Sequence, residues 1–388
     1  MKLADRMARL GTETAFEVLA KAKRLEAEGM DVIHLEIGEP DFDTPANIVS
    51  AGQRALGDGF THYGPSPGLA ELRESIAREV SETRGISVGP ENVVVTPGAK
   101  PIMFFTMLAL VNAGDEVLYP NPGFPIYESM INFVGGVPVP MKLLSSRDFN
   151  VNIDEVAGQI TPNTKLMVIN SPNNPCGSII EKAEVEALAD LAKEHDITVL
   201  TDDVYRRFLY EGEFHSVTSL PGMKDRTIIL DGFSKTYAMT GWRIGYGVMP
   251  LDAAEAVSQL VTNSVSCTAA FTQMAAVEAL GGPQEPAYEI VAEFKKRRDI
   301  FVTGLNSIDG IRCAMPKGAF YAFPDIQGTG MTSRRFADGL LDDHGVAALA
   351  GESFGEYGTG CIRFSFANST ENLERALDRI GNLVASAA

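Results

Sequence analysis

The segment Asp231–Tyr246, with the sequence DGFSKTYAMTGWRIGY, follows a short apolar run, Thr227–Leu230, that is typical of a buried strand. Lys235 stands in the turn directly after this run, beside Gly232 and Ser234. Burial at such a position lowers the pKa of an amine and makes it a better nucleophile. Because a single lysine is usually a solvated surface residue, the neighbouring turns decide how this one is interpreted.

Three other predicted strands also end in turns that carry small or polar residues. Ligands of parallel α/β sheets bind at the carboxyl ends of the strands, so these turns are expected to share one site. Each turn alone has an ordinary structural interpretation as a strand-to-helix turn, a rigid proline turn or a helix N-cap, but their combination with Lys235 favours a binding site. The turns are Pro97–Lys100 after Val93–Thr96, Ser171–Gly177 after Leu166–Asn170, and Asp202–Tyr205 after Thr198–Thr201.

The middle of the chain predicts an α/β fold with a mostly parallel sheet covered by helices. Short strands that are apolar throughout alternate with amphipathic helices such as Lys100–Asn112 and Lys182–His195, a pattern typical of a sheet buried on both faces. The predicted strands are Val93–Thr96, Glu116–Tyr119, Leu166–Asn170, Thr198–Thr201, Thr227–Leu230 and Ile244–Val248.

The two ends of the chain have a different pattern and predict a smaller α+β domain. From about Pro286 the sequence predicts a charged helix, two short strands (Ala319–Phe323 and Cys361–Phe366) and a final helix from Glu371. We therefore expect a large domain over residues 48–285 and a small domain formed by residues 1–47 and 286–388.

The first part of the chain contributes three further predictions. Thr14 and Glu17 have the spacing of a capping box and predict the start of a helix that ends at Gly29. The stretch Ile33–Tyr63 is rich in glycine and proline and indicates mostly loop, and Leu69–Arg84 then indicates a helix.

Composition restricts the partners of the protein. The 388 residues include 33 Lys and Arg against 51 Asp and Glu, a formal charge of −18 that repels nucleic acid and anionic membranes, so neither is an expected partner. No segment has the length and apolarity of a signal peptide or a membrane span, which predicts a cytoplasmic protein. We expect no metal site and no disulfide, since the cysteines are scattered at Cys176, Cys267, Cys313 and Cys361.

Together these segments resemble the class I/II aminotransferases of the aspartate aminotransferase family, which have fold type I of the enzymes that depend on pyridoxal 5'-phosphate (PLP). The resemblance runs from Gly38–Phe42 to Arg363–Ser365 and is most specific in Ser171–Gly177 and Ser234–Tyr246. It implies a homodimeric transferase that moves the amino group of an L-α-amino acid to a 2-oxo acid such as 2-oxoglutarate or pyruvate. Aspartate, alanine and aromatic or aliphatic amino acids are the donors that it implies.

The resemblance also implies a role for each matching residue. Lys235 would bind PLP covalently and later move a proton at the substrate, and Asp202 would contact the pyridine nitrogen. Tyr205 and Asn174 would hydrogen-bond the phenolate oxygen of the cofactor. The phosphate would be held by Gly98, Ala99, Lys100, Ser234 and Arg243.

Four more residues complete the implied site. Phe124 would stack on the cofactor ring, and Tyr63 would reach the phosphate bound by the partner subunit of a homodimer. Arg363 would bind the substrate α-carboxylate with two parallel hydrogen bonds, with Gly38 and Asn174 beside it. The sequence departs from the common family pattern at Cys176, Asp203 and Gly232, of which only Gly232 removes a possible phosphate ligand.

Two other functions remain open at this level. The same fold and cofactor serve β-lyases and other reactions at the α-carbon, because a fold does not determine a reaction. A non-catalytic PLP-sensing module of a transcription regulator is a more distant alternative. It is disfavoured because the N-terminal arm is too short for a DNA-binding domain and the net charge is negative.

Overall fold

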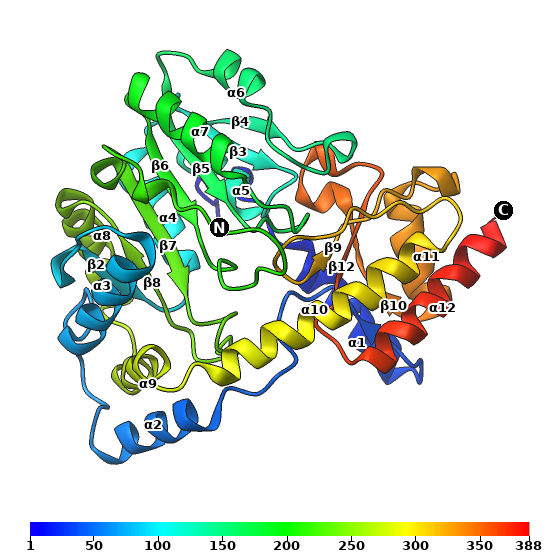
Figure 1. The fold of residues 1–388 in the computed structure, drawn as a ribbon, viewed down its shortest axis with the longest axis horizontal. Helices are drawn as coiled ribbons and strands as arrows, with labels where there is room; N and C mark the ends of the chain where they lie inside the picture. The colour runs from blue at the N-terminus through cyan, green and yellow to red at the C-terminus, as the bar shows by residue number, and fades with distance from the viewer. Residues whose placement is uncertain (388) are drawn as a thin grey trace.

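A seven-stranded sheet forms the centre of the larger part of the molecule (Figure 1). In the computed structural model, which describes residues 1–387, the strand order is β2-β8-β7-β6-β5-β3-β4. Strand β8 is antiparallel to both of its neighbours and every other adjacent pair is parallel, which confirms the predicted α/β fold. The strands are β2 (Val93–Thr96), β3 (Glu116–Asn121), β4 (Val137–Lys142), β5 (Thr164–Asn170), β6 (Thr198–Asp202), β7 (Thr227–Gly232) and β8 (Gly245–Val248).

Helices cover both faces of this sheet because alternate side chains of its strands are apolar on both sides. In β2, for example, Val94 packs into the core on one face, whereas Val93 and Val95 pack into the core on the other. The first face is covered by α4 (Lys100–Leu110), α5 (Ile126–Val134) and α8 (Leu251–Ser264). The second is covered by α3 (Ala70–Arg84), α6 (Ile153–Gln159), α7 (Lys182–Glu194) and α9 (Ala270–Gly281).

A second core forms where the two ends of the chain meet. Strand β1 (Ile33–His34) pairs in parallel with β10 (Val346–Ala347), and a small antiparallel sheet has the order β11-β12-β9. Figure 1 shows the long helix α10 leading from α9 to the region of α11 and α12. The remaining elements are α1 (Thr14–Ala27), β9 (Tyr321–Ala322), β11 (Leu349–Ala350), β12 (Ile362–Ser365), α10 (Glu285–Asn306), α11 (Ser333–His344) and α12 (Thr370–Ala387).

The domain boundaries at residues 47/48 and 285/286 stay a prediction. Apolar residues of α10, α11 and α12 pack around β9 and β12, and this core also includes Tyr205 and Phe208 from the turn after β6. Among residues 1–387, no helix is both long and apolar enough to cross a membrane.

One prediction for the N-terminal part is incomplete and another is wrong. The stretch Ile33–Tyr63 is not only loop, because α2 (Ala46–Gly57) lies within it and buries Ile48 and Ala55. The capping box is not formed, since α1 begins at Thr14 itself and the N-cap residue is Glu13, which makes no capping hydrogen bond. The carboxylate of Glu13 has another partner, described below.

Candidate active site

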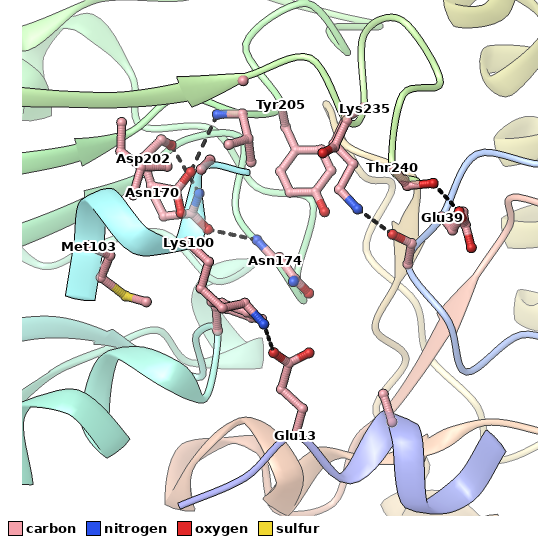
Figure 2. A pocket seen from close by; sticks show the side chains of 18 of the residues that line it. Glu13, Glu39, Lys100, Met103, Asn170, Asn174, Asp202, Tyr205, Lys235 and Thr240 are labelled. Atoms are coloured by element: carbon pink, nitrogen blue, oxygen red, sulfur yellow. Dashed lines mark hydrogen bonds and ion pairs between the residues drawn. The ribbon is translucent and has the colours of Figure 1, made fainter. Parts of the chain in front are cut away.

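A cavity of about 500 Å³ opens at the carboxyl ends of β5, β6 and β7. Residues of α1, β9 and β12 and of the loop after β1 close it from the other side, so both ends of the chain contribute to it. Among the predicted site residues, only Gly98 and Tyr63 do not line this cavity. Figure 2 shows how the lining side chains from these elements point toward one another.

Lys235 lies in the turn after β7 and points into the cavity (Figure 2). Its Nζ atom donates a hydrogen bond of 2.5 Å to the backbone oxygen of Gly38. Burial lowers the pKa of Lys235 to about 8, so its amine loses its proton more readily than that of an exposed lysine. The backbone of the same turn is in the left-handed region at Ala238 (φ 48°) and Arg243 (φ 51°), a conformation that is uncommon outside glycine and often found at functional sites.

Asp202 ends β6 and is buried against the cavity. Burial raises the pKa of its carboxyl to about 7, although a hydrogen bond of 2.5 Å from the Tyr127 hydroxyl to Oδ2 opposes the shift. The adjacent Asp203 does not line the cavity; it pairs with the buried guanidinium of Arg84 at 3.0 Å. Of the two neighbouring acids, Asp202 is therefore the one placed to contact a ligand.

Two tyrosines form a buried pair beside Lys235. The hydroxyls of Tyr205 and Tyr321 are 2.6 Å apart, and burial raises the pKa of both. Asn174, from the proline-containing turn after β5, lies on the same side of the cavity, and its backbone N–H donates to Oδ1 of Asn170 at 2.9 Å. These groups provide neutral hydrogen-bond donors and acceptors near the lysine.

The turn before α4 has the properties of an anion site. Gly98 has φ 89°, and a Cβ atom there would lie 2.3 Å from Nη2 of Arg243, so only glycine allows the guanidinium to approach this closely. The backbone N–H groups at the start of α4 point away from the helix and favour negative charge. Ala99, Ser234 and Arg243 line the adjoining part of the cavity.

Lys100 lies at the start of α4, and its side chain reaches the N-terminal segment of the chain. Its Nζ atom forms an ion pair with the carboxylate of Glu13, and it lies 5.3 Å from the centroid of the Phe124 ring. The Phe124 ring itself lines the cavity, as predicted for a residue that stacks on the cofactor.

Arg363, on β12, is buried and lies between two aromatic rings, with its guanidinium carbon 4.6 Å from the Tyr321 centroid and 4.8 Å from that of Phe354. Nη1 donates to Oδ1 of Asn174 at 3.3 Å, and Nη2 donates to the backbone oxygen of Glu36. Within residues 1–387, its Nε has no hydrogen-bond partner although it is buried. A buried donor of this kind is expected to have a partner, and a carboxylate ligand would supply one.

Tyr63 is outside the site of its own chain. Its side chain is 90% exposed and does not line the cavity. Its predicted contact with a partner subunit stays a prediction.

The cavity also contains residues that the sequence pattern does not single out. Tyr127 lies on α5 and Tyr321 on β9, and neither follows a predicted strand of the large sheet. The sequence pattern does not identify Asn170 or Glu13 as site residues either. Asn170 is the last residue of a strand, and Glu13 is a helix N-cap. The one sequence signal that could have indicated Tyr127 is its spacing from Phe124, an aromatic residue in the turn that directly precedes α5.

Comparison with known proteins defines the class. The chain matches the family model for aminotransferase class I and II over residues 30–380. It is 41% identical over 359 residues to an aspartate aminotransferase of Pyrococcus abyssi, covering 91% of this chain and 92% of the relative. It is 36% identical to aromatic-amino-acid aminotransferase 2 of Thermococcus litoralis, covering 98% of this chain and 97% of the relative.

Solved structures agree with this assignment. The aspartate aminotransferase from Thermus thermophilus with maleate is 37% identical and superimposes with a TM-score of 0.94, covering 99% of this chain and 100% of that one. The chain therefore belongs to the class I and II aminotransferases, and it is an enzyme of fold type I that transfers amino groups. Membership of this family implies PLP as cofactor.

The residues of the cavity fit that cofactor. The space that Gly98 leaves beside Arg243 suits a phosphate, and the buried amine of Lys235 suits an aldehyde. Asp202 presents a carboxyl group to the same cavity, as a pyridine nitrogen requires.

Proposed function

We propose that this aminotransferase binds PLP in the cavity through Lys235 and exchanges the amino group of an L-α-amino acid with a 2-oxo acid. One observation carries the proposal. The buried amine of Lys235, the buried carboxyl of Asp202 and the buried guanidinium of Arg363 come from three different strands or strand ends and line one cavity. When bound there, PLP supplies an electron-withdrawing ring that stabilises negative charge at the substrate α-carbon.

Different residues of the cavity are assigned to different parts of the cofactor. Asp202, held by Tyr127, is assigned to the ring nitrogen, and a carboxylate there keeps that nitrogen protonated. Phe124 is assigned to the ring face. The phenolate oxygen is assigned to Asn174 and Tyr205, and the phosphate to the turn Gly98–Lys100 with Ser234 and Arg243.

Lys235 and Arg363 are assigned to the substrate. The Lys235 amine would be the base that takes the proton from the substrate α-carbon and then gives it back to the reacting molecule. In the cofactor-free protein, burial lowers the pKa of this amine to about 8, which makes it a readier proton acceptor near neutral pH than an exposed lysine. Arg363 fixes the α-carboxylate through its Nε and a neighbouring N–H, so that the α-hydrogen points to one side of the cavity.

Three further properties belong to the same proposal. The enzyme acts as a homodimer in which Tyr63 of each subunit completes the site of the other. It works in the cytoplasm, and its substrates include amino acids of the kinds named for its relatives, aspartate and aromatic amino acids, together with alanine.

The role of Asp202 can be tested with the half-reaction, in which an amino acid abolishes the visible absorption of the bound cofactor. We expect Asp202→Asn to bind PLP but to react on the order of 10²-fold more slowly, because the amide no longer stabilises charge on the ring. An Asp202→Asn enzyme that reacts at the wild-type rate would show that Asp202 only caps the turn and would contradict this assignment.

A further inference from the structure

The loop after β1 holds three groups of the site through its backbone. The backbone oxygen of Glu36 accepts a hydrogen bond from Nη2 of Arg363, and that of Gly38 accepts one from Nζ of Lys235 at 2.5 Å (Figure 2). Gly38 also packs against Tyr321, because a Cβ atom at this position would overlap the tyrosine hydroxyl. A shift of this loop would therefore displace the partners of all three side chains together.

The Glu36 side chain anchors this loop in the interior of the protein. It is 0% exposed, and its Oε1 atom lies 2.7 Å from Nδ1 of His34. Among the residues that the structure describes, its other oxygen, Oε2, has no hydrogen-bond partner. A buried carboxylate is strongly unfavourable unless a cation compensates its charge, so the position of Glu36 depends on the charge of the neighbouring His34 ring.

His34 is placed to supply that charge. Its ring lies between two carboxylates, with Nε2 3.1 Å from Oε1 of Glu26 on α1, and its side chain is 25% exposed. The hydrogen bond with Glu36 raises the pKa of His34 most, burial opposes this shift, and Glu26 raises the pKa further. A neutral group, the amide of Asn368, donates a hydrogen bond of 3.1 Å to the backbone oxygen of His34.

Other charged groups around β1 have partners of their own. They are Lys23 on α1, which lies 3.3 Å from Glu26, and Asp31, which pairs with Arg375 and Arg379 on α12. On β12, the hydrogen bond of Arg363 goes to the backbone oxygen of Glu36. Among residues 1–387, His34 is therefore the cation in contact with the Glu36 carboxylate.

We propose that His34 and Glu36 are a positioning pair for the substrate α-carboxylate, which keeps the loop after β1 against Arg363 only while His34 carries a positive charge. This deepens the proposed function and rests on it, because it takes Arg363 as the group that binds the α-carboxylate. When His34 loses its proton, the Glu36 carboxylate is left buried without a cation, and the loop moves so that water can hydrate it. The backbone oxygen that holds Arg363 moves with the loop.

The raised pKa of His34 gives the direction of the pH effect. The contribution of the pair is fully present below the ordinary value of 6.5, and it is lost as the pH rises through the raised pKa of the folded protein. Binding of a carboxylate at Arg363 should therefore weaken as the pH rises through that pKa.

Ligand binding to the holoenzyme tests the pair. The probe is 3-phenylpropionate, which carries one carboxylate, and calorimetry measures its Kd from about pH 5.5 to about pH 9.5, on either side of the ordinary histidine pKa. Glu36→Gln has a neutral side chain of the same shape that needs no cation. We expect the Kd of wild type to rise about fivefold more over this range than that of Glu36→Gln. The titration of the bound cofactor is common to both proteins, so the difference isolates the pair.

Two further variants separate charge from shape. His34→Asn keeps an N–H donor in place of Nδ1 but has no charge, so it should bind 3-phenylpropionate about fivefold more weakly than wild type at low pH and equally well at high pH. His34→Asn/Glu36→Gln should regain the tight binding, because no buried charge remains. His195→Asn, which removes an exposed histidine at the end of α7, is the matched control and should keep the wild-type pH profile.

NMR of the histidine rings follows the protonation of His34 in the folded holoenzyme. We expect its titration midpoint to lie above that of the exposed His195, and to fall in Glu36→Gln because the strongest influence that raises it is then lost. This measurement and the comparison of wild type with Glu36→Gln need no His34 variant, so they decide the matter even if His34→Asn does not fold.

Equal pH profiles of wild type and Glu36→Gln would overturn the inference, and so would a double variant that binds as weakly as His34→Asn. Arg363→Lys distinguishes this failure from a failure of the proposed function. If Arg363→Lys weakens the binding of 3-phenylpropionate but the pair variants keep the wild-type profile, the inference alone is wrong. If Arg363→Lys leaves the Kd unchanged, Arg363 does not bind the carboxylate, and both the assignment and the inference are wrong.

Discussion

The groups around Lys235 shift the pKa of its amine in opposite directions. Burial lowers its pKa most, Glu39 opposes this, and Arg363 lowers the pKa further. The folded-state pKa of about 8 lies below the ordinary value of 10.5, so between these values the folded chain binds fewer protons than the unfolded chain. Burial of this amine therefore opposes folding of the cofactor-free protein, most strongly below pH 8, and this unfavourable contribution disappears as pH rises from about 8 to 10.5.

The same shift predicts how Lys235 reacts in the cofactor-free protein. We expect its acetylation by trace acetic anhydride to increase with pH and to reach half of its maximum at about pH 8. Lysines of ordinary pKa reach that point only near pH 10.4 and serve as the internal reference. Mass spectrometry of peptides measures each site, and a midpoint for Lys235 equal to that of the reference lysines would show that the amine is not buried.

Arg363→Lys tests the carboxylate site. Lysine keeps the charge but loses the planar fork, so the substrate loses about one charge-assisted hydrogen bond. We expect kcat/KM to fall about ten- to a hundredfold, equally for amino acids and 2-oxo acids, because both carry the same carboxylate. Simple amines, which lack the carboxylate, provide the control. If the variant impaired an amino acid and its decarboxylated amine equally, Arg363 would be structural.

Sequence patterns identify some site residues and hide others for a physical reason. Lys235, Asp202 and Asn174 follow strands, and the carboxyl ends of parallel strands meet at one edge of a sheet, so their proximity can be predicted. Tyr127 and Tyr321 become site residues only through contacts across 75 and 116 positions, to Asp202 and Tyr205 respectively. No local pattern contains such contacts. The same is true of Glu13, whose partner Lys100 lies on a different element.

At the scale of elements, the prediction of the sheet was complete except for β4. This strand contains Pro138 and Pro140, which argue against a strand because proline cannot donate a ladder hydrogen bond. In the structure β4 is the last strand of the sheet and pairs only with β3. The backbone nitrogens of residues i and i+2 in a strand face the same side. Both prolines can therefore turn their nitrogens, which carry no hydrogen, to the free edge of the sheet. An edge position cannot be read from the sequence of the strand itself.

Helix α2 was hidden by the glycines and prolines around it. Its own buried positions, Ile48, Ala51, Gly52 and Ala55, have helical spacing, and Pro45 and Gly57 stand at its two ends. Gly52 allows close packing, because a Cβ atom there would lie 2.7 Å from the Trp242 ring. The proline and the glycine that mark the ends of this helix are therefore the reason why the sequence predicts mostly loop here.

Gly245, the first residue of β8, controls how closely that strand approaches the turn before α4. A Cβ atom there would lie 2.3 Å from the backbone nitrogen of Ala99, which cannot move without shifting the turn assigned to the phosphate. We expect Gly245→Ala to weaken PLP binding at least tenfold and to destabilise the protein by about 1–3 kcal/mol.

Equilibrium dialysis of PLP and thermal unfolding measure the two effects. Gly158→Ala is the matched control, because nothing lies within 4 Å of its added Cβ atom; it should leave PLP binding unchanged and, at a position within helix α6, should not lower the stability. A Gly245→Ala protein with wild-type affinity for PLP would show that the turn can move at little cost.

At the scale of the whole molecule, the two ends of the chain return to the large sheet and supply about a third of the residues that line the site. Arg363, Tyr321 and Glu13 come from the segments predicted as the small domain, whereas Lys235 and Asp202 come from the sheet. The family resemblance predicted this joint origin for Arg363 and Gly38. The order of helices and strands alone predicted two domains, but it did not predict which surfaces of the two domains face each other across the site.

The position of Tyr63 leads to a prediction about the homodimer. Because its side chain is 90% exposed and outside the cavity of its own chain, we expect it to act in the site of a partner subunit. Tyr63→Ala and Lys235→Ala should each have low activity, but mixing them under conditions of subunit exchange should restore roughly a quarter of wild-type activity, since half of the dimers then contain one undamaged site. Exchange is verified with differently tagged subunits. No recovery despite exchange would count against shared sites.

The covalent attachment point of PLP tests the central claim most directly. Borohydride reduction of the yellow holoenzyme fixes the cofactor on the amine that holds it, and peptide mapping by mass spectrometry then identifies that residue. The structure predicts the mass of a reduced phosphopyridoxyl group on the peptide that contains Lys235, in one copy per chain, and its absence from Lys235→Ala. A label on Lys100 or on any other lysine, or no label at all, would contradict the account.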